Sequence, residues 1–565
     1  MPVASTPAAA TSVMKEWALL EMTGGEALAR QLVREGITML FGLPGVQLDH
    51  AFAGLYAERE RIQFRGPRHE QTTTYMADAY ARTRGEAGVA MVVPGPGVLN
   101  AGAGLATAYA CSSPVLLIAG QIPSRHIGRG LGLLHEIPDQ MAVLQSLTKW
   151  TGRATRPEEI PSLVRQAFTH MWRGRPRPVA LEVPPDVLEP RAAVRLLDPD
   201  PGLRDRLRTT PDVGRVREAA ALLSRAVRPL IYAGYGVVAS GASAELAQLA
   251  ERLQAPVVVS SNGKGALSDR HPLALNTLGG MALMAETDVV LAVGTRFMAG
   301  QDQAVKTGAK VILLNADPQD LTDPRRPTIA METDARTGLE ALSAELDTLP
   351  RRGAPWADVA GLKRRSREDA MSIHPQADFC RALRNAIPDD GILVSEMTQV
   401  GYVARAAYPV YEPRTFVHPG YQGTLGYGFP AALGVKAGLP DRAVVSITGD
   451  GGMGWGLSEL ATAKRYNLGL ITVVFDDKAF GNVKRIQKEQ FDGHLIGSEL
   501  VNPDFVRLAE SFGVHGLRVD TPDALEGALK EALQADAPCL IEVPVGEMDS
   551  MRTQLARREP VAQPS

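Results

Sequence analysis

Two acidic side chains in the last third of the chain directly follow apolar runs. Asp450 lies in the segment 447–452 (ITGDGG), and Asp477 lies in the segment 470–481 (LITVVFDDKAFG). Twenty-seven positions separate the two residues, which is about one strand–helix–strand crossover. Because the carboxyl ends of neighbouring parallel strands meet at one edge of a sheet, we expect these carboxylates to lie together. Paired carboxylates in such a place suit a hard cation such as Mg²⁺.

Glycines surround the first of these carboxylates. Gly449, Gly451 and Gly452 leave backbone N–H groups free to meet phosphate oxygens. A GDG sequence alone is common in solvated turns, and such a turn is the simpler interpretation. The second acidic loop, one crossover further along the chain, favours a site for a metal ion and a diphosphate.

Short apolar runs alternate with helical patterns along the chain, and Gly and Pro lie between them. This alternation predicts right-handed βαβ units and parallel sheets, and therefore an α/β fold. Helices are expected over 25–35, ending at Gly36, and over 98–110. Strands are expected at 37–41, 87–93, 114–120, 177–184, 229–233, 255–260, 288–293, 310–314, 391–394, 443–448, 470–475 and 539–543.

Two polar segments, 197–212 and 350–355, are typical of linkers. They divide the chain into three doubly wound parallel-sheet domains, expected at 18–190, 212–349 and 370–550. The last strands of the first and third domains end alike, in PRPVALEVP and DAPCLIEVP. Duplication and convergent strand composition explain this short match about equally well.

Five short motifs in the first and third domains hold further candidate residues. They are FGLPG at 41–45, RHE at 68–70, PGPG at 94–97 followed by Asn100, GQIP at 120–123, and GTLGYGFP at 423–430. A glutamate after a histidine is usually an ordinary surface residue. Glu70, however, precedes an Ala-rich helical pattern at 72–83, which favours a functional position.

Together with the acidic loops, these motifs resemble those of the thiamin diphosphate-dependent enzymes, in particular the acetolactate synthase-like branch of the decarboxylases and carboligases. The resemblance covers about 18–546. It implies a pyrimidine-binding first domain, a central domain and a diphosphate-binding third domain. It also implies a catalytic centre between the first domain of one subunit and the third domain of its partner, and therefore a homodimer or homotetramer.

The resemblance assigns the metal and cofactor positions. Asp450, Asp477 and Ala479 would hold Mg²⁺. Glu70 would bind N1′ of the aminopyrimidine ring and so activate the cofactor. Leu425 would fold the cofactor into its bent form, although the sequence also allows an ordinary core leucine. Thiamin diphosphate would contact Pro44, Gly45, Glu70, Gly95, Asn100, Gly401, Leu425, Gly449, Gly451, Gly452 and Met453.

The implied reaction is the decarboxylation of a 2-oxo acid such as pyruvate, followed by ligation to a second carbonyl, the acceptor. Gln121 would face the substrate. His135 is as consistent with a proton relay as with an ordinary loop histidine. The alternatives are a decarboxylase without ligation, a hydrolase of a cyclic dione, and a non-catalytic cofactor-binding subunit. Glu70 argues against the last, because anchoring a cofactor needs no base-activating carboxylate.

The sequence departs from acetolactate synthases at several single positions. Asp476 and Asp477 stand where most relatives carry two asparagines, and Ile486 takes the place of a tryptophan that helps to select the acceptor. The arginine that grips the acceptor carboxylate would fall near Gly300 and is absent. Arg296 matches a different, structural arginine.

Two segments depart from the family in length. The loop 128–140 differs from the shorter family version, and it places His135 and Glu136 near the expected entrance of the active site. The segment 276–286 is short where relatives build part of an FAD site. The sequence therefore leaves FAD binding open.

Composition and charge exclude several classes of protein. Among 565 residues, 60 Lys and Arg against 63 Asp and Glu leave a formal net charge of −3, which gives no long-range attraction to nucleic acid or to an anionic membrane. The apolar runs, such as 114–120, are too short to span a bilayer. Cys111, Cys380 and Cys539, with no CxxC motif, exclude a disulfide framework. The first fifteen residues lack the features of a secretory signal, so we expect a disordered tail and a cytoplasmic protein.

Overall fold

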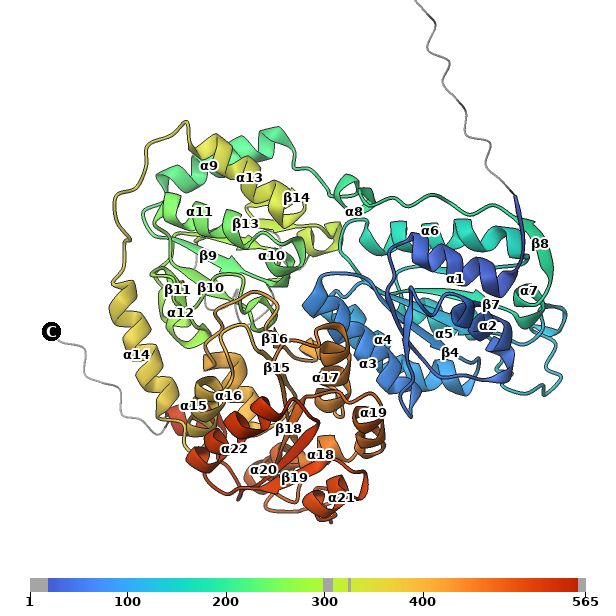
Figure 1. Cartoon of the computed structure of the whole chain (residues 1–565). Helices are drawn as coiled ribbons and strands as arrows, with labels where there is room; N and C mark the ends of the chain where they lie inside the picture. Colours follow the sequence, from blue (N-terminus) through green and yellow to red (C-terminus); the bar gives the residue numbers. More distant parts are fainter. Residues whose placement is uncertain (1–18, 298–307, 324–326, 557–565) are drawn as a thin grey trace, which may run out of the picture.

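The computed structural model describes residues 19–297, 308–323 and 327–556. These residues form three six-stranded parallel sheets with helices packed against them, which confirms the expected α/β class. In Figure 1 the first domain is blue to cyan, the middle domain green, and the third domain orange to red. The expected disordered tail lies outside the described residues.

The first domain is built on a sheet with the strand order β3-β2-β4-β5-β7-β6. The register between β4 and β5 runs from Gly88 opposite Val115 to Val92 opposite Ala119. Both strands are buried along their whole length, as is typical of parallel strands that helices cover on both faces. The elements are β1 (Leu20–Thr23), β2 (Met39–Gly42), β3 (Gln63–Arg65), β4 (Gly88–Val92), β5 (Val115–Gly120), β6 (Thr151–Arg153), β7 (Val179–Val183), β8 (Arg191–Val194), α1 (Gly24–Arg34), α2 (Asp49–Ala57), α3 (Glu70–Arg84), α4 (Pro96–Cys111), α5 (Gln140–Leu147), α6 (Ile160–Trp172) and α7 (Pro185–Leu188).

The first helix illustrates how local sequence sets these elements. Thr23 caps α1, and the backbone N–H of Thr23 in turn donates to the carboxylate of Glu26 at 2.8 Å, which completes a capping box. After the helix Gly36 adopts φ +85°, a backbone conformation that favours glycine. The helix expected over 25–35 is therefore present, with its first residue at Gly24.

The middle domain has a different sheet, with the order β11-β10-β9-β12-β13-β14. Chain order reverses between β9 and β12, which is the arrangement of a doubly wound nucleotide-binding fold. The elements are β9 (Pro229–Ala233), β10 (Val257–Val259), β11 (Ala274–Leu275), β12 (Val289–Val293), β13 (Lys310–Asn315), β14 (Ile329–Glu332), α9 (Val213–Arg225), α10 (Tyr235–Ser240), α11 (Ser243–Leu253), α12 (Thr277–Met284) and α13 (Ala335–Leu346).

The third domain contains a sheet with the order β16-β15-β17-β18-β20-β19. Its elements are β15 (Ile392–Ser395), β16 (Phe416–Val417), β17 (Val444–Gly449), β18 (Ile471–Asp476), β19 (His515–Arg518), β20 (Cys539–Pro544), α15 (Gln376–Ala386), α16 (Gln399–Ala407), α17 (Gly428–Gly438), α18 (Asp450–Met453), α19 (Leu460–Arg465), α20 (Gly481–Gln490), α21 (Phe505–Ser511), α22 (Pro522–Ala535) and α23 (Met551–Ala556).

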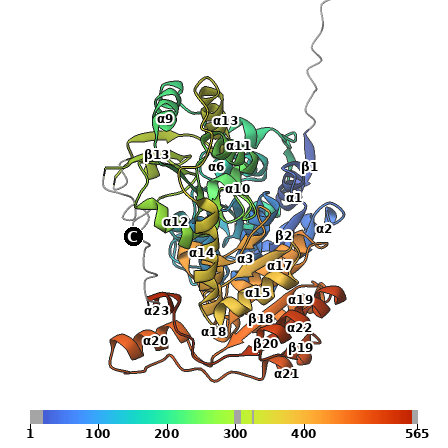
Figure 2. The same ribbon diagram turned by 90° about the vertical axis from the view of Figure 1, so that its left-hand side faces the viewer.

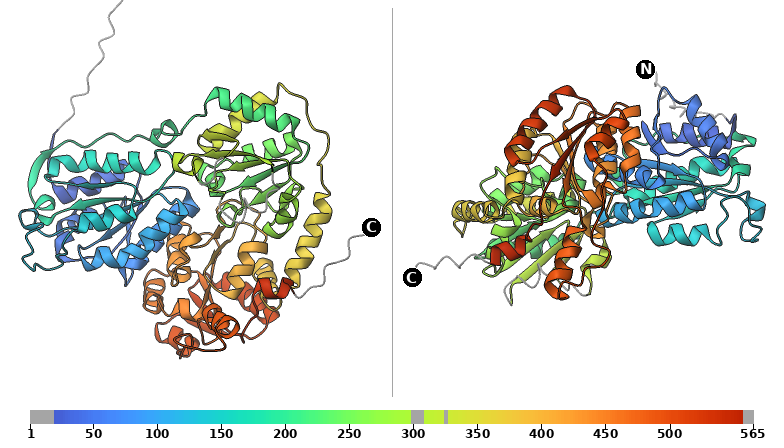
Figure 3. Two further views of the ribbon diagram at one scale, coloured as in Figure 1. Left: turned by 180° about the vertical axis from the view of Figure 1, so that it is seen from behind. Right: turned by 90° about the horizontal axis from the view of Figure 1, so that it is seen from below.

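One buried apolar cluster runs through the first and third domains, whereas the middle domain has a cluster of its own. At the junction α3 packs against α4 and α17. A methyl group at Gly104 would lie 2.0 Å from Thr74 Oγ1, and one at Gly434 would lie 2.2 Å from Met76 O, so both helices approach α3 closely only with glycine there. Seen from behind, the blue helices of the first domain lie against the orange helices of the third (Figure 3).

Segments between the domains also contain helices. The expected linker 197–212 includes α8 (Leu203–Arg206), and the charged residues beyond 355 form α14 (Val359–Met371). Figure 2 shows α14 running between the middle and third domains. The three cysteines are free and buried. Within the described ranges, every helix is too short or too polar to cross a membrane.

Candidate functional site

A cleft opens at the carboxyl ends of β17 and β18 in the third domain. The two strands pair in parallel, with Gly449 opposite Phe475. Asp450 and Asp477 follow these strands directly and line the same cleft, whose volume is about 250 Å³. The two acidic loops that the sequence places one crossover apart therefore meet at one edge of the sheet.

The acidic side chains of this cleft lack cationic partners. The pKa of Asp450 is raised to about 7, chiefly by burial and in part by the charge of Asp477. Burial also raises the pKa of Asp477. Within the described ranges neither carboxylate forms an ion pair with Lys or Arg. A divalent cation would supply the missing opposite charge.

A single amide bridges the two strand ends behind these carboxylates. Asn502 Nδ2 donates to Asp450 Oδ2 at 2.7 Å and to Asp476 Oδ1 at 2.8 Å. Sequence analysis missed Asn502, because it lies in a polar loop with no motif around it. Across the described ranges, no three or more His, Cys, Asp and Glu side chains are grouped as a metal site. A metal ion here would therefore need ligands besides carboxylates, such as backbone carbonyl and diphosphate oxygens.

Glycines of the GDGG turn line the cleft beside the carboxylates. Gly451 and Gly452 lie in the short helix α18, and a methyl group at Gly452 would come within 2.1 Å of Glu396 Oε1. Ala479 also lines the cleft, and its backbone N–H donates to Asp477 Oδ1 at 3.1 Å. The lining next to the two carboxylates is therefore rich in glycine, which suits the approach of an anion to backbone N–H groups.

Leu425 also lines this cleft. It is half-buried and lies outside the buried apolar clusters, which favours the functional interpretation over an ordinary core leucine. Its turn is held from below by Glu396, a buried side chain that sequence analysis missed. The carboxylate of Glu396 accepts from the backbone N–H groups of Gly426 at 2.6 Å and Gly428 at 2.9 Å, and from Thr448 Oγ1 at 2.6 Å.

Two of the expected cofactor contacts lie behind the cleft rather than in its lining. Gly401 is buried in α16, where a methyl group would lie 2.3 Å from Glu396 O. Met453 is buried in the cluster that the first and third domains share. The lining instead includes Thr398, Gln399 and Tyr402, which sequence analysis missed and which lie at the start of α16, shortly after β15.

Glu70 begins α3 rather than preceding it, because His69 caps the helix by accepting from the backbone N–H of Gln71 at 3.1 Å. The Glu70 carboxylate is half-exposed and accepts from Asn100 Nδ2 at 3.0 Å. Two residues expected at the cofactor, from separate motifs, are thus in contact. The N-terminal ends of α3 and α4 therefore lie next to each other, because Glu70 is the first residue of α3 and Asn100 lies near the start of α4.

The loop 128–140 closes over the start of α4. His135 has φ +68°, and its carbonyl oxygen lies against Gly95, where a methyl group would come within 2.3 Å. His135 Nδ1 lies 3.0 Å from Gln47 Oε1, and Gln47 Nε2 donates to the carbonyl of Leu134 at 3.1 Å. The buried Gln47, two positions after the FGLPG motif, therefore orients His135 and was missed by sequence analysis.

The loop is shaped further by Glu136. Its carboxylate accepts from the backbone N–H groups of Gly130 at 3.0 Å and Leu133 at 2.9 Å, and these bonds hold its pKa below the usual value. In the FGLPG motif, Pro44 is exposed. Gly45 lies so close to Val93 that a methyl group at Gly45 would come within 2.3 Å of Val93 Cγ1.

Gln121 is buried and bonded within the first domain. Its Nε2 donates to Glu182 at 2.6 Å, and its Oε1 accepts from the backbone N–H of Ile122 at 2.7 Å. Glu182 is fully buried and also accepts from Gln140 Nε2 at 2.8 Å and from Arg153. Both the nitrogen and the oxygen of the Gln121 amide are therefore hydrogen-bonded within the first domain. That Gln121 faces the substrate stays a prediction.

The segment around Glu70 is tied to the third domain of the same chain. The buried Glu459 accepts from the backbone N–H groups of Arg68 at 3.0 Å and His69 at 3.1 Å. Tyr75 OH lies 2.8 Å from Thr424 Oγ1. In the described ranges, however, third-domain residues alone line the acidic cleft. The acidic cleft and the Glu70–Asn100 group are thus separate within one chain, and we refer to these two groups of candidate residues as half-sites.

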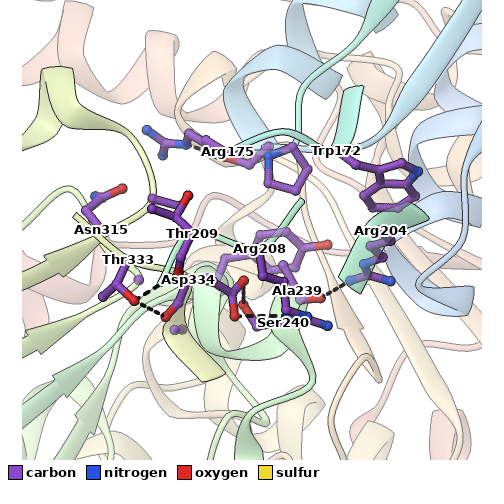
Figure 4. Close-up of a pocket in the computed structure, with 18 residues that line it drawn as sticks. Trp172, Arg175, Arg204, Arg208, Thr209, Ala239, Ser240, Asn315, Thr333 and Asp334 are labelled. Carbon is purple, nitrogen blue, oxygen red and sulfur yellow. Dashed lines mark hydrogen bonds and ion pairs between the residues drawn. The ribbon is translucent and has the colours of Figure 1, made fainter. Parts of the chain in front are cut away.

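A second crevice lies between the first and middle domains, at the carboxyl ends of β9, β12, β13 and β14. In Figure 4 Arg208 and Ser240 lie together with Asp334, and Arg204 lies beside Ala239. Arg208 donates to Asp334 at 2.9 Å, Ser240 donates to the same carboxylate at 2.8 Å, and Arg204 lies 4.5 Å from the ring of Trp172. About 80 Å³ is left open. Side chains of the linker therefore fill the place where a doubly wound sheet would bind a dinucleotide.

The remaining positions that depart from the family are placed as follows. Arg296 lies over the ring of Tyr421 of the third domain at 4.1 Å. Ile486 is half-buried in α20. The segment 276–286 contains α12, whose N-terminus is capped by Asn276. Gly300 lies outside the described residues.

Comparison with known proteins matches each of the three domains. Three family models of thiamine pyrophosphate enzymes match the chain. The N-terminal TPP binding domain matches residues 22–143, the central domain 216–342 and the C-terminal TPP binding domain 396–543. A probable acetolactate synthase large subunit of Methanocaldococcus jannaschii is 34% identical over 94% of this chain and 93% of its own. The acetolactate synthase isozyme 3 large subunit of Escherichia coli is 32% identical over 91% and 92%. A probable 2-ketoarginine decarboxylase of Pseudomonas aeruginosa is 36% identical over 92% and 94%.

Proposed function

The chain belongs to the thiamine pyrophosphate enzymes and is of the acetolactate synthase type, and on this premise we propose that it decarboxylates a 2-oxo acid and joins the remaining acyl unit to a second carbonyl. The observation that carries the proposal is the pair Asp450 and Asp477, one buried and one half-buried, which lie at adjacent strand ends in a cleft that Gly449, Gly451 and Gly452 also line.

The residues present fit Mg²⁺ and the diphosphate of the cofactor. Asp450, Asp477 and the backbone carbonyl of Ala479 would ligate the ion, and Gly449, Gly451 and Gly452 would face the phosphates. Leu425 would support the rings, while Gly401 and Met453 would act through the packing beneath the cleft. When bound, thiamin diphosphate supplies the carbon nucleophile and the electron sink for loss of CO₂.

The first domain would supply the proton chemistry. The Glu70 carboxylate, oriented by Asn100, would hold a proton at its Oε atom toward the pyrimidine nitrogen of the cofactor. His135, oriented by Gln47, would transfer protons at the entrance of the active site. Gln121 would form part of the wall of the substrate pocket. Pro44, Gly45 and Gly95 would bring backbone close to the pyrimidine ring, since two of the three tolerate no side chain.

We further propose that two chains combine the half-sites in a homodimer or a homotetramer. Large apolar side chains are exposed beside both half-sites, which single-chain packing leaves unexplained. Near the first half-site they are Val46, Leu99, Leu131 and Leu134, and on the third domain they are Tyr421, Trp455, Val483, Ile496 and Val501. A dimer would cover both groups and bring Glu70 to the acidic cleft of the partner.

The role of Glu70 is tested by exchange of the cofactor C2 proton. Glu70→Gln should leave thiamin diphosphate binding unchanged and slow hydrogen–deuterium exchange at C2 by roughly a hundredfold or more, because the amide cannot take up the proton. Exchange is measured by NMR after acid quenching. Glu60→Gln, at a carboxylate that is 87% exposed, is the control. An unchanged exchange rate in Glu70→Gln would remove Glu70 from this role.

A decarboxylase without ligation is the second candidate function. The similarity to the probable 2-ketoarginine decarboxylase supports it, as does Ile486 in place of the tryptophan. The protein, thiamin diphosphate and Mg²⁺ should be incubated with a panel of 2-oxo acids, and the products identified by mass spectrometry. Ligated 2-hydroxy-ketone products support the first proposal, and aldehydes as the sole products support the second.

We propose that the chain binds no stoichiometric FAD. The open volume of the middle-domain crevice, about 80 Å³, is small, and Arg204 and Arg208 occupy its mouth. Purified protein should therefore be colourless. A flavin absorption band that corresponds to one FAD per chain would contradict this. The three buried free cysteines fit a reducing compartment, and we propose a cytoplasmic location. The domain limits 18–190, 212–349 and 370–550 likewise stay proposals.

A further inference from the structure

A large cavity between the middle and third domains lies outside both half-sites. Its volume is about 760 Å³, within the range of small-molecule sites. The linker helix α14 forms one wall, α15 and α16 form the second, and the chain around Asp269 and Arg270 of the middle domain forms the third. In Figure 2, α14 crosses this region in front of α15.

The charge of this cavity is strongly one-sided. Its lining in the described ranges includes six cationic side chains and one carboxylate, Asp269. The cationic residues are Arg270, Lys363, Arg364, Arg367, Arg381 and Arg384. Such a concentration of like charge raises the local concentration of anions and favours their binding.

Existing partners neutralise only part of this charge. Arg270 pairs with Asp389, and Arg381 lies 3.8 Å from Asp378 and 3.7 Å from Asp523. Arg384 donates only to backbone carbonyls, among them Pro388 at 2.7 Å. Among the described residues, no ion pair or hydrogen bond is formed by the side chains of Arg364 and Arg367, which lie one turn apart on α14.

The floor of the cavity is apolar and aromatic. Val403, Ala407 and Tyr408, from α16 and its C-terminus, line this side of the cavity. Val403 and Tyr408 are almost fully buried, whereas Ala407, Pro409 and Tyr411 are half-buried and remain partly accessible. Tyr411 carries Arg270 on its ring at 3.7 Å. An inorganic anion would contact the cationic side chains alone, whereas a ligand with a flat apolar body and several negative charges would also contact Ala407 and the ring of Tyr411.

We propose that this cavity binds an organic phosphate, with a ring system on the apolar floor and two or more phosphate groups between Arg364, Arg367 and Arg384. Nucleoside di- and triphosphates and coenzyme A have this chemistry. Such a ligand would join α14 to the third domain, so it would stabilise the contact between the middle and third domains.

The chain offers a matched pair of variants on one helix. Arg364→Glu/Arg367→Glu reverses the charge of the rim. Arg365→Glu makes the same kind of change on the same helix, but Arg365 lines a different depression beside Trp356 and Asp358. Ala407→Phe fills the floor of the cavity and leaves its charge unchanged. The melting temperature of each variant reports whether it folds.

Binding is measured by calorimetry with protein saturated in thiamin diphosphate and Mg²⁺, so that the acidic cleft cannot take up the probe. ATP with excess Mg²⁺, coenzyme A, adenosine and inorganic tripolyphosphate are the probes. ATP or coenzyme A should bind and raise the melting temperature. The probe that binds more tightly shows whether the cavity prefers a nucleoside triphosphate or coenzyme A. Affinity should fall roughly tenfold or more in Arg364→Glu/Arg367→Glu and in Ala407→Phe, and stay unchanged in Arg365→Glu.

Several results would overturn the proposal. They are the absence of saturable binding by ATP and coenzyme A at millimolar concentration, equal affinity in all variants, and tripolyphosphate binding as tightly as ATP. A change of oligomer mass in Arg364→Glu/Arg367→Glu without nucleotide binding to the unaltered protein would assign this face to contact between chains instead. None of these outcomes depends on which 2-oxo acid the enzyme uses.

Discussion

The first and third domains share one strand order but differ in the chemistry of their strand ends. In both sheets the second strand in chain order lies at the edge, beside the first strand. At the other side, the last strand in chain order lies inside the sheet and the strand before it lies at the edge. The two orders are β3-β2-β4-β5-β7-β6 and β16-β15-β17-β18-β20-β19. After β17 and β18 the third domain carries Asp450 and Asp477, whereas after β4 and β5 the first domain carries Gly95 and Gln121. The same scaffold therefore places two carboxylates at the strand ends of one domain and uncharged, buried residues at the equivalent strand ends of the other.

The correspondence extends to single side chains. In the first domain Arg153 lies opposite Glu182 across β6 and β7, and the two form an ion pair. In the third domain Arg518 lies opposite Glu542 across β19 and β20, and they are 2.9 Å apart. The matching register and strand order favour duplication over convergence as the origin of the similar strand ends EVP.

The largest expected effect comes from removing the acid that distinguishes the third domain. Asp450→Ala should abolish Mg²⁺-dependent binding of thiamin diphosphate, with a loss of roughly a hundredfold or more, because the ion loses a charged ligand. Calorimetry with and without Mg²⁺ measures the effect, and far-ultraviolet circular dichroism checks the fold. Asp441→Ala, at an exposed position of the same domain, is the control. Normal affinity for both Mg²⁺ and cofactor in Asp450→Ala would refute the metal assignment.

An intermediate effect should separate the two equivalent ion pairs. Glu182→Ala should destabilise the first domain by about 3 kcal/mol, since it leaves Arg153 and the amides of Gln121 and Gln140 without their buried acceptor. Glu542→Ala should cost about 1 kcal/mol, because Arg518 is half-exposed and keeps Asp504 as a partner at 3.0 Å. Urea denaturation midpoints give the order of the two effects, and equal midpoints would contradict it.

The smallest effect concerns the charge of the acidic cleft in protein from which the metal has been removed. Since the pKa of Asp450 is raised in the folded chain, its contribution to stability without metal should decrease as pH rises from about 4 to about 7. Asp477→Asn removes the neighbouring charge, so it should flatten this decrease and stabilise the metal-free chain by less than about 1 kcal/mol, because solvent partly screens the pair.

The measurement is the melting temperature in a chelator at pH 5 and pH 7. Asp441→Asn is the matched control. Because an amide oxygen can still ligate Mg²⁺, Asp477→Asn should keep metal-dependent cofactor binding. A metal-free Asp477→Asn protein that melts below the unaltered chain at pH 7 would contradict the expected repulsion.

The strands that the sequence predicts and those that it misses differ in their place in the sheets. All twelve expected strands are present, and each lies inside a sheet, where burial on both faces requires a continuous apolar run. Missing from the sequence analysis are the six edge strands and the two strands β1 and β8, which pair only with each other. The edge strands β3 and β19 are partly exposed, whereas β11 and β16 are buried but only two residues long. At an edge one neighbour is absent, so the apolar signal of the strand is weaker.

Sequence alone determined the domain type, the two acidic loops and the Glu70 motif, because these depend on local patterns and on short crossovers between neighbouring strands. Tertiary structure alone decided which side chains complete the half-sites. Glu396, Asn502 and Gln47 reach the sites from loops that are distant in sequence or lack a motif, and their roles arise from contacts that only chain packing creates. The basic cavity beside α14 likewise exists only because three separate segments meet there.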